Sequence, residues 1–220
     1  MSDNIDQNAL SYFDSAYRNY DIQNPPSKLQ HYLDAVSARL QVPQPRLLDV
    51  GCGRGLFLKH AHDRHTDWAF YGIDPTAEGV TETSTLVPEA AVFRGRADSM
   101  PFRPESFDVI TAWDVLEHVP DLQLALSEIV RCLRTGGLIT MVVPVYDGIT
   151  GPMIRALDRD RTHIHKESRE YWTGLVDTHF DRVEWHGIYR YMISKSRYVH
   201  RATRGLRRNT PAILVTAFKD

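Results

Sequence analysis

The chain has 220 residues, of which 42% are hydrophobic and 25% charged, a composition typical of a folded globular protein and not of a disordered one. Its two cysteines are too few for a disulfide scaffold, and no apolar run is long enough for a membrane-spanning helix. The first residues have no basic region followed by an apolar stretch, so we expect no signal peptide, no membrane partner and a cytoplasmic location.

The formal net charge of −2 conceals an uneven distribution of charge. Residues 187–220 contain eight lysines and arginines and one acid, so the rest of the chain carries a net charge of −9. A basic segment on an acidic body favours an anionic ligand, with a nucleic acid or the protein's own acids as alternatives. Four arginines of this segment recur at helical spacing and predict one basic helix face: Arg197, Arg201, Arg204 and Arg208.

Apolar residues recur at helical spacing between Leu29 and Leu40, so residues 1–45 are predicted to be mainly helical. Strands and helices then alternate. Strands are predicted at Arg46–Val50, Trp68–Ile73, Ala91–Arg94, Phe107–Ala112 and Leu138–Val143. Helices are predicted at Leu56–His65, Glu78–Leu86 and Leu122–Leu133. This alternation predicts an α/β fold, with a doubly wound parallel sheet covered by helices on both faces.

After Pro144 the pattern changes. A loop rich in Gly, Asp, Arg and His is predicted over residues 146–166, followed by a helix at Ser168–Thr178. Two further strands, Val183–Tyr191 and Ala212–Phe218, are predicted to close the sheet as a hairpin-like pair. The basic segment, at about 191–210, is then an insert between these last two strands.

The turn after the first strand indicates a ligand. Its glycines read G-x-G-x-G and follow Asp49, whereas a dinucleotide-binding turn reads G-x-G-x-x-G. A carboxylate at this place repels a pyrophosphate and suits an ammonium group. Asp74 ends the next strand, where it can accept hydrogen bonds from a ribose, and Asp98 follows the third strand, where it can accept one from an exocyclic amine. A ligand with an amine, a ribose and an adenine but no phosphate is S-adenosylmethionine.

Five segments carry a resemblance to a known family, in that family's order. They are LLDVGCGRG at 47–55, Gly72-Ile73-Asp74, Asp98-Ser99-Met100, the stretch from Phe107 to Val119, and Leu133-Arg134-Thr135-Gly136-Gly137. On these motifs the chain resembles the class I S-adenosylmethionine-dependent methyltransferases. It is most similar to the branch that contains ubiquinone-biosynthesis and small-molecule methyltransferases. The resemblance extends over about residues 47–143 and is looser in the flanks.

This resemblance implies a fold of seven strands, mostly parallel, with an antiparallel last strand. It also implies that residues 1–45 form a helical lid over the cofactor and that residues 46–220 form the methyltransferase domain. Aromatic residues of the lid segment are expected to pack against the domain, with one near the cofactor: Tyr12, Phe13, Tyr17 and Tyr20. No pattern in the sequence indicates an oligomeric state.

The resemblance further implies a set of cofactor contacts at the ends of successive strands. The expected residues are Asp49, Gly51 and Gly53 at the methionine end, Asp74 and Pro75 at the ribose, Asp98, Ser99 and Met100 at the adenine, and Trp113 and Asp114 beside the methyl group or the methionine end. The cofactor is S-adenosylmethionine, and its product is S-adenosylhomocysteine.

For the acceptor we expect a small molecule, with an anionic group favoured by the basic segment. The loop after the fifth strand reaches over the methyl group in this family, so His163, with Asp160, is the candidate general base for a hydroxyl acceptor. Glu117-His118 is more often a loop-shaping pair than a catalytic one. N- or C-methylation of a small molecule is one alternative, because an amine or carbon acceptor can react without that base.

Methylation of RNA through the basic face is the other alternative. Base-modifying methyltransferases usually carry [DN]-P-P-[YF] after the fourth strand, where this chain reads Ala112-Trp113-Asp114-Val115, so no nucleic acid partner is expected. Residues 158–165 contain acids and histidines, but these lack a fixed metal-binding spacing and have no cysteine nearby. No metal is therefore expected.

Overall fold

The computed structural model describes residues 20–149, 151–158, 160–194, 197–205 and 207–220. Eight strands form one sheet: β1 (Arg46–Val50), β2 (Ala69–Asp74), β3 (Ala91–Arg94), β4 (Phe107–Trp113), β5 (Leu133–Pro144), β6 (Arg182–Ser194), β7 (Arg197–Thr203) and β8 (Ala212–Phe218). The helices described are α2 (Tyr20–Gln23), α3 (Pro26–Ser37), α4 (Leu56–His62), α5 (Ala77–Leu86), α6 (Leu122–Cys132), α7 (Gly151–Leu157) and α8 (Arg169–Asp177), with short 3₁₀ helices η2 (Leu116–His118) and η3 (Arg207–Asn209).

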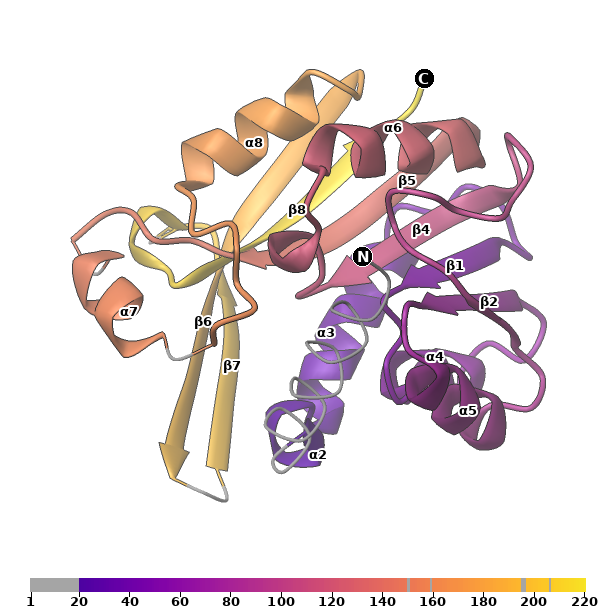
Figure 1. Cartoon of the computed structure of the whole chain (residues 1–220), viewed down its shortest axis with the longest axis horizontal. Helices are drawn as coiled ribbons and strands as arrows, with labels where there is room; N and C mark the ends of the chain where they lie inside the picture. Colours follow the sequence, from indigo (N-terminus) through magenta and orange to yellow (C-terminus); the bar gives the residue numbers. More distant parts are fainter. Residues whose placement is uncertain (1–19, 150, 159, 195–196, 206) are drawn as a thin grey trace, which may run out of the picture.

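The strand order is β3-β2-β1-β4-β5-β8-β6-β7 (Figure 1). Strands β1 to β5 run parallel to one another, and β8 runs antiparallel to both β5 and β6. The predicted doubly wound α/β sheet with an antiparallel last strand is confirmed. The chain order reverses between β1 and β4, and such a reversal opens a crevice at the carboxyl ends of the strands, where open α/β sheets bind ligands.

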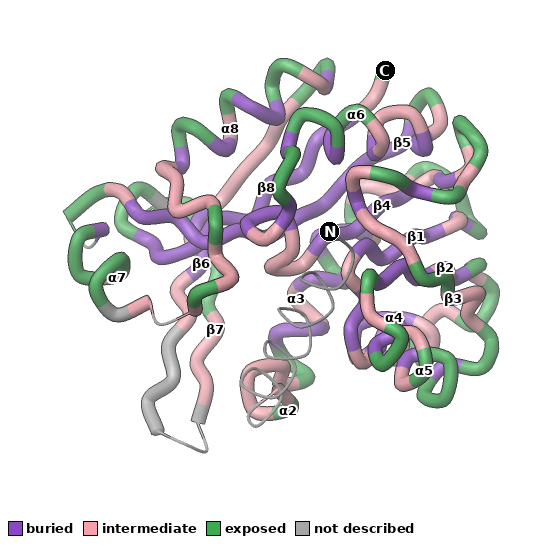
Figure 2. Tube along the Cα trace, viewed as in Figure 1, coloured by how far each residue is buried: buried purple, intermediate pink, exposed green. Residues whose placement is uncertain are grey.

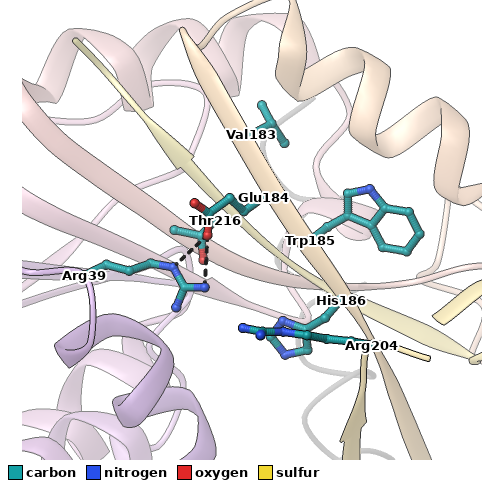
Figure 3. Close-up of a pocket in the computed structure, with 7 residues that line it drawn as sticks. All are labelled: Arg39, Val183, Glu184, Trp185, His186, Arg204 and Thr216. Carbon is teal, nitrogen blue, oxygen red and sulfur yellow. Dashed lines mark hydrogen bonds and ion pairs between the residues drawn. The ribbon is translucent and has the colours of Figure 1, made fainter. Parts of the chain in front are cut away.

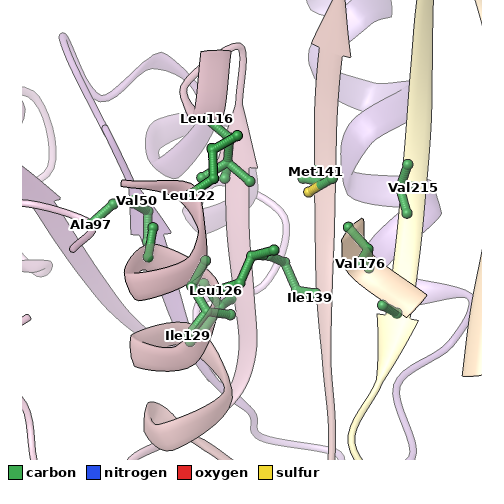
Figure 4. Close-up of a cluster of buried hydrophobic side chains, with 14 of the residues drawn as sticks. Val50, Ala97, Leu116, Leu122, Leu126, Ile129, Ile139, Met141, Val176 and Val215 are labelled. Carbon is green, nitrogen blue, oxygen red and sulfur yellow. The ribbon is translucent and has the colours of Figure 1, made fainter. Parts of the chain in front are cut away.

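Helices cover both faces of the sheet (Figures 1 and 2). On β5, Ile139 and Met141 face α6 and α8, whereas Leu138 and Val142 face α3 and α4. The two faces therefore carry two separate hydrophobic cores, and Figure 4 shows the first, in which Leu126 of α6 packs on the sheet. Such burial on both faces explains why the central strands are nearly continuous apolar runs in the sequence.

The sheet has eight strands where seven were predicted, because the basic segment folds as β7 and not as a helix. Two alternate residues of β7 contact α3. The ring centroid of Tyr198 lies 5.5 Å from the Lys28 ammonium, and Nε2 of His200 lies 2.7 Å from Nδ1 of His31 in the same helix. His186 of β6 joins them, 3.3 Å from His31. Contacts with α3 at every second residue favour a strand over the helical spacing of the arginines.

The predicted basic helix face is therefore wrong within the described residues. Arg201 lies exposed on β7, Arg204 lies in the following turn, and Arg208 lies in η3. A second difference is α7, which forms inside the predicted loop of residues 146–166. Its Gly-Pro start resembles a loop signal, although proline is well tolerated in the first turn of a helix. Within the described ranges, no helix has both the length and the apolar character that crossing a bilayer requires.

Leu126 and Leu124 lie on opposite sides of α6, since Leu126 is fully buried and Leu124 is 48% exposed. We expect Leu126→Ala to lower the free energy of unfolding by about 2–5 kcal/mol, because it leaves a cavity between the helix and the sheet. Leu124→Ala, the matched control, should change it by less than about 0.5 kcal/mol. Equal losses of unfolding free energy in the two variants, measured by urea unfolding, would contradict this account of the core.

Candidate active site

A tight turn joins β1 to α4 and is pinned to the end of β2. The backbone N–H groups of Gly51 and Cys52 donate to the carbonyl oxygen of Ile73 at 2.7 and 3.2 Å. Gly51 and Gly53 have φ values of 68° and 52°, a region that residues with a Cβ rarely adopt. A Cβ on Gly51 would also lie 2.5 Å from the Val115 side chain. The turn therefore requires glycine and leaves bare backbone beside α4.

Two buried carboxylates lie beside this turn. Asp74 accepts hydrogen bonds from the backbone N–H of Gly53 at 2.9 Å and from the backbone and hydroxyl of Thr76 at 2.9 and 2.6 Å. A carboxylate can accept about four hydrogen bonds, so Asp74 keeps room for a ligand hydroxyl. Asp49 accepts one from the hydroxyl of Thr111 at 2.7 Å. Asp74 thus links the turn to α5 as well as facing the crevice.

Asp49 has no cationic partner among the described residues. Burial raises its pKa to about 7, which the hydrogen bond from Thr111 opposes and the charge of Asp74 reinforces. Tyr20 of α2 is close enough to both acids to interact with their charges. Burial, together with the charges of Asp49 and Asp74, raises the pKa of its phenol far above the ordinary value. Tyr20 also lies under the guanidinium of Arg54, 5.9 Å from its ring centroid. Tyr12, Phe13 and Tyr17 fall outside the described residues.

The loop after β3 carries the predicted adenine-side residues. Asp98 forms two hydrogen bonds with Arg96, at 2.8 and 2.6 Å, and these hold the pKa of the carboxyl below its usual value. The backbone N–H of Met100 donates to Glu128 of α6 at 2.8 Å, and the Met100 side chain is 5% exposed in the first core. Ser99 lies between them and pairs with Arg96 through an isolated bridge. The loop is thereby anchored to α6.

At the end of β4, Trp113 packs against the N-terminal helix α3. Its ring is stacked on Tyr32 with centroids 4.2 Å apart and contacts Phe57 edge-on at 5.0 Å. Its indole nitrogen is buried and has no hydrogen-bond acceptor among the described residues. Trp113 therefore forms a wall between α3, α4 and the end of the sheet.

Asp114, the next residue, has a positive φ of 57° and forms ion pairs with Arg190 of β6 and with Lys28 of α3, the latter at 3.7 Å. Burial raises the pKa of Asp114, but the two cations outweigh it and lower the pKa to about 2. Burial lowers the pKa of Lys28 to about 8, against the attraction of Asp114. This network joins three elements that are distant in the sequence.

The loop after β5 brings His163 to the same region. Its Nδ1 lies 2.9 Å from a carboxylate oxygen of Asp158 and 3.0 Å from the hydroxyl of Tyr146. Its Nε2 faces Asp160 at 3.6 Å and Glu117 of η2 at 3.9 Å. Hydrogen bonds from Lys166, Tyr146 and His163 overcome the effect of burial and lower the pKa of Asp158. His163 is thus fixed through one nitrogen, with the other directed at two acids.

A separate pocket lies over β6 and the end of α3 (Figure 3). Glu184 there accepts hydrogen bonds from Arg39 at 3.1 and 3.2 Å. Its lining residues are Arg39, Val183, Glu184, Trp185, His186, Arg204 and Thr216. None of the residues predicted for cofactor binding or catalysis is among them, so this pocket is distinct from the candidate active site.

Solved structures share this fold. The structure of an S-adenosylmethionine-dependent methyltransferase of Thermotoga maritima matches this one with a TM-score of 0.71 and 16% sequence identity. The match covers 96% of this chain and 97% of that one. A methyltransferase of Haloferax volcanii, solved with its Trm112 activator, gives a TM-score of 0.72 at 19% identity over 95% of this chain and 96% of that one. Residues 48–141 also match the methyltransferase domain family.

Residues 48–141 thus carry a methyltransferase domain, and the fold around them is that of solved S-adenosylmethionine-dependent methyltransferases. Among curated relatives, the uncharacterized methyltransferase YcgJ of Bacillus subtilis is 30% identical over 59% of this chain and 54% of its own length. A ubiquinone biosynthesis O-methyltransferase of Xanthomonas campestris is 31% identical over 62% of this chain and 60% of its own. The chain thus matches little more than half the length of these relatives.

The methyltransferase domain fits its cofactor, S-adenosylmethionine. Any Cβ at Gly51 would collide with Val115, so the turn is shaped for close approach of a ligand to the backbone. The uncompensated carboxylate of Asp49 suits the ammonium group of the methionine end. A pyrophosphate would meet two buried acids here, so a phosphorylated dinucleotide does not fit.

Lys28 and Arg190 were missed as site residues. Lys28 carries a usable signal, because it precedes Tyr32 by four residues and therefore lies on the apolar stripe of α3. Arg190 carries none, since its partner Asp114 is 76 residues away and only the folded sheet brings them together.

The methyltransferase domain allows a direct test of the turn. We expect Gly51→Ala to weaken S-adenosylmethionine binding by about tenfold or more in calorimetry, because the added methyl displaces the turn against Val115. Gly136→Ala is the matched control, since Gly136 also has a positive φ, 78°, but a Cβ there meets nothing within 4 Å. Equal losses of S-adenosylmethionine affinity in both variants would show that general backbone strain, and not the contact of the turn with Val115, weakens binding.

A second test uses the raised pKa of Asp49. Burial favours the protonated carboxyl, so the stability it contributes is present at low pH and is lost as the pH rises through about 7. We expect Asp49→Asn, without ligand, to gain in Tm over the wild type as the pH is raised from about 5 to about 8. The variant should also bind S-adenosylmethionine about tenfold or more weakly. A pH-independent Tm difference would contradict the assignment.

Proposed function

We propose that the protein transfers the methyl group of S-adenosylmethionine to a hydroxyl group of a small-molecule acceptor. The observation that carries the proposal is the orientation of His163: its Nδ1 donates a hydrogen bond to the Asp158 carboxylate at 2.9 Å and lies 3.0 Å from the Tyr146 hydroxyl, which leaves Nε2 as the nitrogen that can accept a proton. An O-methyltransferase among the relatives, named for ubiquinone biosynthesis, supports a hydroxyl acceptor.

In this proposal the strand ends hold the cofactor. Asp49 pairs with its ammonium group, Asp74 accepts hydrogen bonds from its ribose, and Asp98 accepts one from its adenine amine. When bound, S-adenosylmethionine supplies an electrophilic methyl group on a positively charged sulfur. The remaining proposed contacts are Gly51, Gly53, Pro75, Ser99, Met100, Trp113 and Asp114. Tyr20 covers the two acids of the turn, which supports a role for the N-terminal helical residues as the lid.

The contribution of the protein is position and proton transfer. The sulfonium is already a good leaving group, so holding the acceptor oxygen in line with the methyl group supplies much of the rate. A hydroxyl must also lose its proton. His163 Nε2 is the proposed acceptor of that proton, and Asp160, 3.6 Å away, stabilises the imidazolium that results.

The charge of the crevice supports an anionic acceptor. Arg190 and Lys28 both form ion pairs with Asp114, so these three side chains together carry one net positive charge near neutral pH. A basic surface for RNA, by contrast, depended on a helix carrying four arginines, and β7 replaces that helix. We therefore propose a small anionic molecule as the acceptor.

The proposal is tested on a panel of small hydroxyl acceptors with labelled S-adenosylmethionine. We expect His163→Asn to lower kcat by about 10²-fold, because the proton acceptor is lost, while cofactor affinity stays unchanged. His62→Asn is the matched control, since His62 also faces an acid, Glu89, and its side chain is 19% exposed against 17% for His163. Transfer confined to amine or carbon acceptors would refute the proposed function.

A further inference from the structure

Glu117 is a buried acid without a partner. It is 0% exposed, and neither carboxylate oxygen has a hydrogen-bond donor among the described residues. Its neighbours are compensated: Asp114 pairs with Arg190 and Lys28, and Lys166 lies 2.9 Å from Asp158. A fully buried carboxylate whose oxygens have no hydrogen-bond donor is costly, and a cation bound beside it would remove that cost.

Two histidines converge on the Glu117 carboxylate. One ligand atom each from Glu117, His118 and His163 lie within 4.8 Å of one another. His163 Nε2 lies 3.9 Å from Glu117 Oε1 and 3.6 Å from Asp160 Oδ2. Ligands held about 2.0–2.1 Å from a tetrahedral Zn²⁺ are about 3.3 Å apart. A cation at the centre would thus need to draw these groups in by only a few tenths of an ångström to about 1.5 Å.

The outer contacts of both histidines are those of metal ligands. Nδ1 of His163 is held by Asp158 and Tyr146, and Nδ1 of His118 lies 3.0 Å from the carbonyl oxygen of Thr162. Histidines that bind metals commonly use one ring nitrogen as the ligand while the other donates to a carboxylate or a carbonyl. This pattern assigns ligation to Nε2 of each ring.

We propose that Glu117, His118 and His163 bind one divalent transition-metal ion, with Asp160 as a further ligand. Two imidazoles with one or two carboxylates suit Zn²⁺ or Mn²⁺ better than Ca²⁺ or Mg²⁺, which prefer oxygen ligands throughout. The ligands come from η2 and from the loop after β5, so the ion would tie these two segments together. This proposal departs from the expectation, based on sequence spacing, that no metal binds.

Binding of the ion would also change the role of His163, and this consequence rests on the proposed function. In the metal-free chain Nε2 of His163 is the proposed proton acceptor, whereas in the metal-bound chain it would be a ligand and the ion would activate the hydroxyl instead. An acceptor hydroxyl coordinated at an open position would have a lowered pKa and release its proton to water. Its oxygen then forms the bond to the methyl carbon while the carbon–sulfur bond breaks, and the sulfur keeps the electron pair, which gives a methyl ether and S-adenosylhomocysteine.

Calorimetric titration of ZnCl₂ into the metal-stripped full chain tests the site without cofactor or acceptor. We expect one equivalent to bind, and Glu117→Gln to weaken binding by at least about 100-fold, more than the loss typical of an outer contact. Glu184→Gln is the matched control, a glutamate on β6 paired with Arg39 and remote from the cluster. It should bind Zn²⁺ as the wild type does.

Thermal unfolding of the same proteins shows whether Glu117→Gln still folds. The amide removes a buried charge, so the metal-free variant should match or exceed the Tm of the metal-free wild type, and Zn²⁺ should raise the Tm of the wild type alone. Failure of Zn²⁺ and Mn²⁺ to bind the wild type, or equal binding by Glu117→Gln, overturns the proposal. Zinc binding without transfer to any hydroxyl would refute the proposed function and leave the metal site standing.

Discussion

The hydrogen bonds between the glycine turn and the end of β2 organise the ligand-binding edge of the sheet. The carbonyl of Ile73 and the carboxylate of Asp74 receive three backbone N–H groups from the turn, so two parallel strands and α4 share one rigid junction. Because no side chain intervenes, bare backbone and two acids lie at the crevice. The choice of an amine-bearing cofactor over a phosphorylated one follows from this junction.

A second constraint acts across the crevice, at the end of β4. Asp114 takes a strained backbone conformation, and Arg190 and Lys28 hold its carboxylate in place. The residue thus links the N-terminal helix α3 and the C-terminal strand β6 to the centre of the sheet. The proposed acceptor side of the site therefore draws on both flanks of the domain, where the resemblance to known methyltransferases is loosest.

Much of the fold could be predicted from the sequence, because buried strands are short apolar runs bounded by Gly, Pro or Asp. The bounds of β1, β3 and β8 agree residue for residue with the predictions. The prediction failed at β7, where the arginine spacing indicated a helix. The residues that decide its conformation are Tyr198 and His200, whose partners on α3 are more than 160 residues away.

The candidate site, like the fold, could be predicted from the sequence only in part. The glycines and acids at strand ends could be found from local motifs, since the motif and the geometry are the same few residues. Glu117 was interpreted mainly as a loop-shaping residue and less often as a catalytic one, because its lack of a partner is a property of the folded interior. Sequence spacing likewise could not reveal that His118 and His163, 45 positions apart, converge on it.

The three imidazoles between α3, β6 and β7 have a consequence of their own. His31 hydrogen-bonds to both His186 and His200, and burial lowers the pKa of His186 to about 4 and that of His200 to about 3. Because the rings are neutral, they can pack closely between α3 and the β6–β7 hairpin. Strong acid would place three like charges between α3, β6 and β7, and their repulsion would weaken the packing of the edge strand that distinguishes this domain.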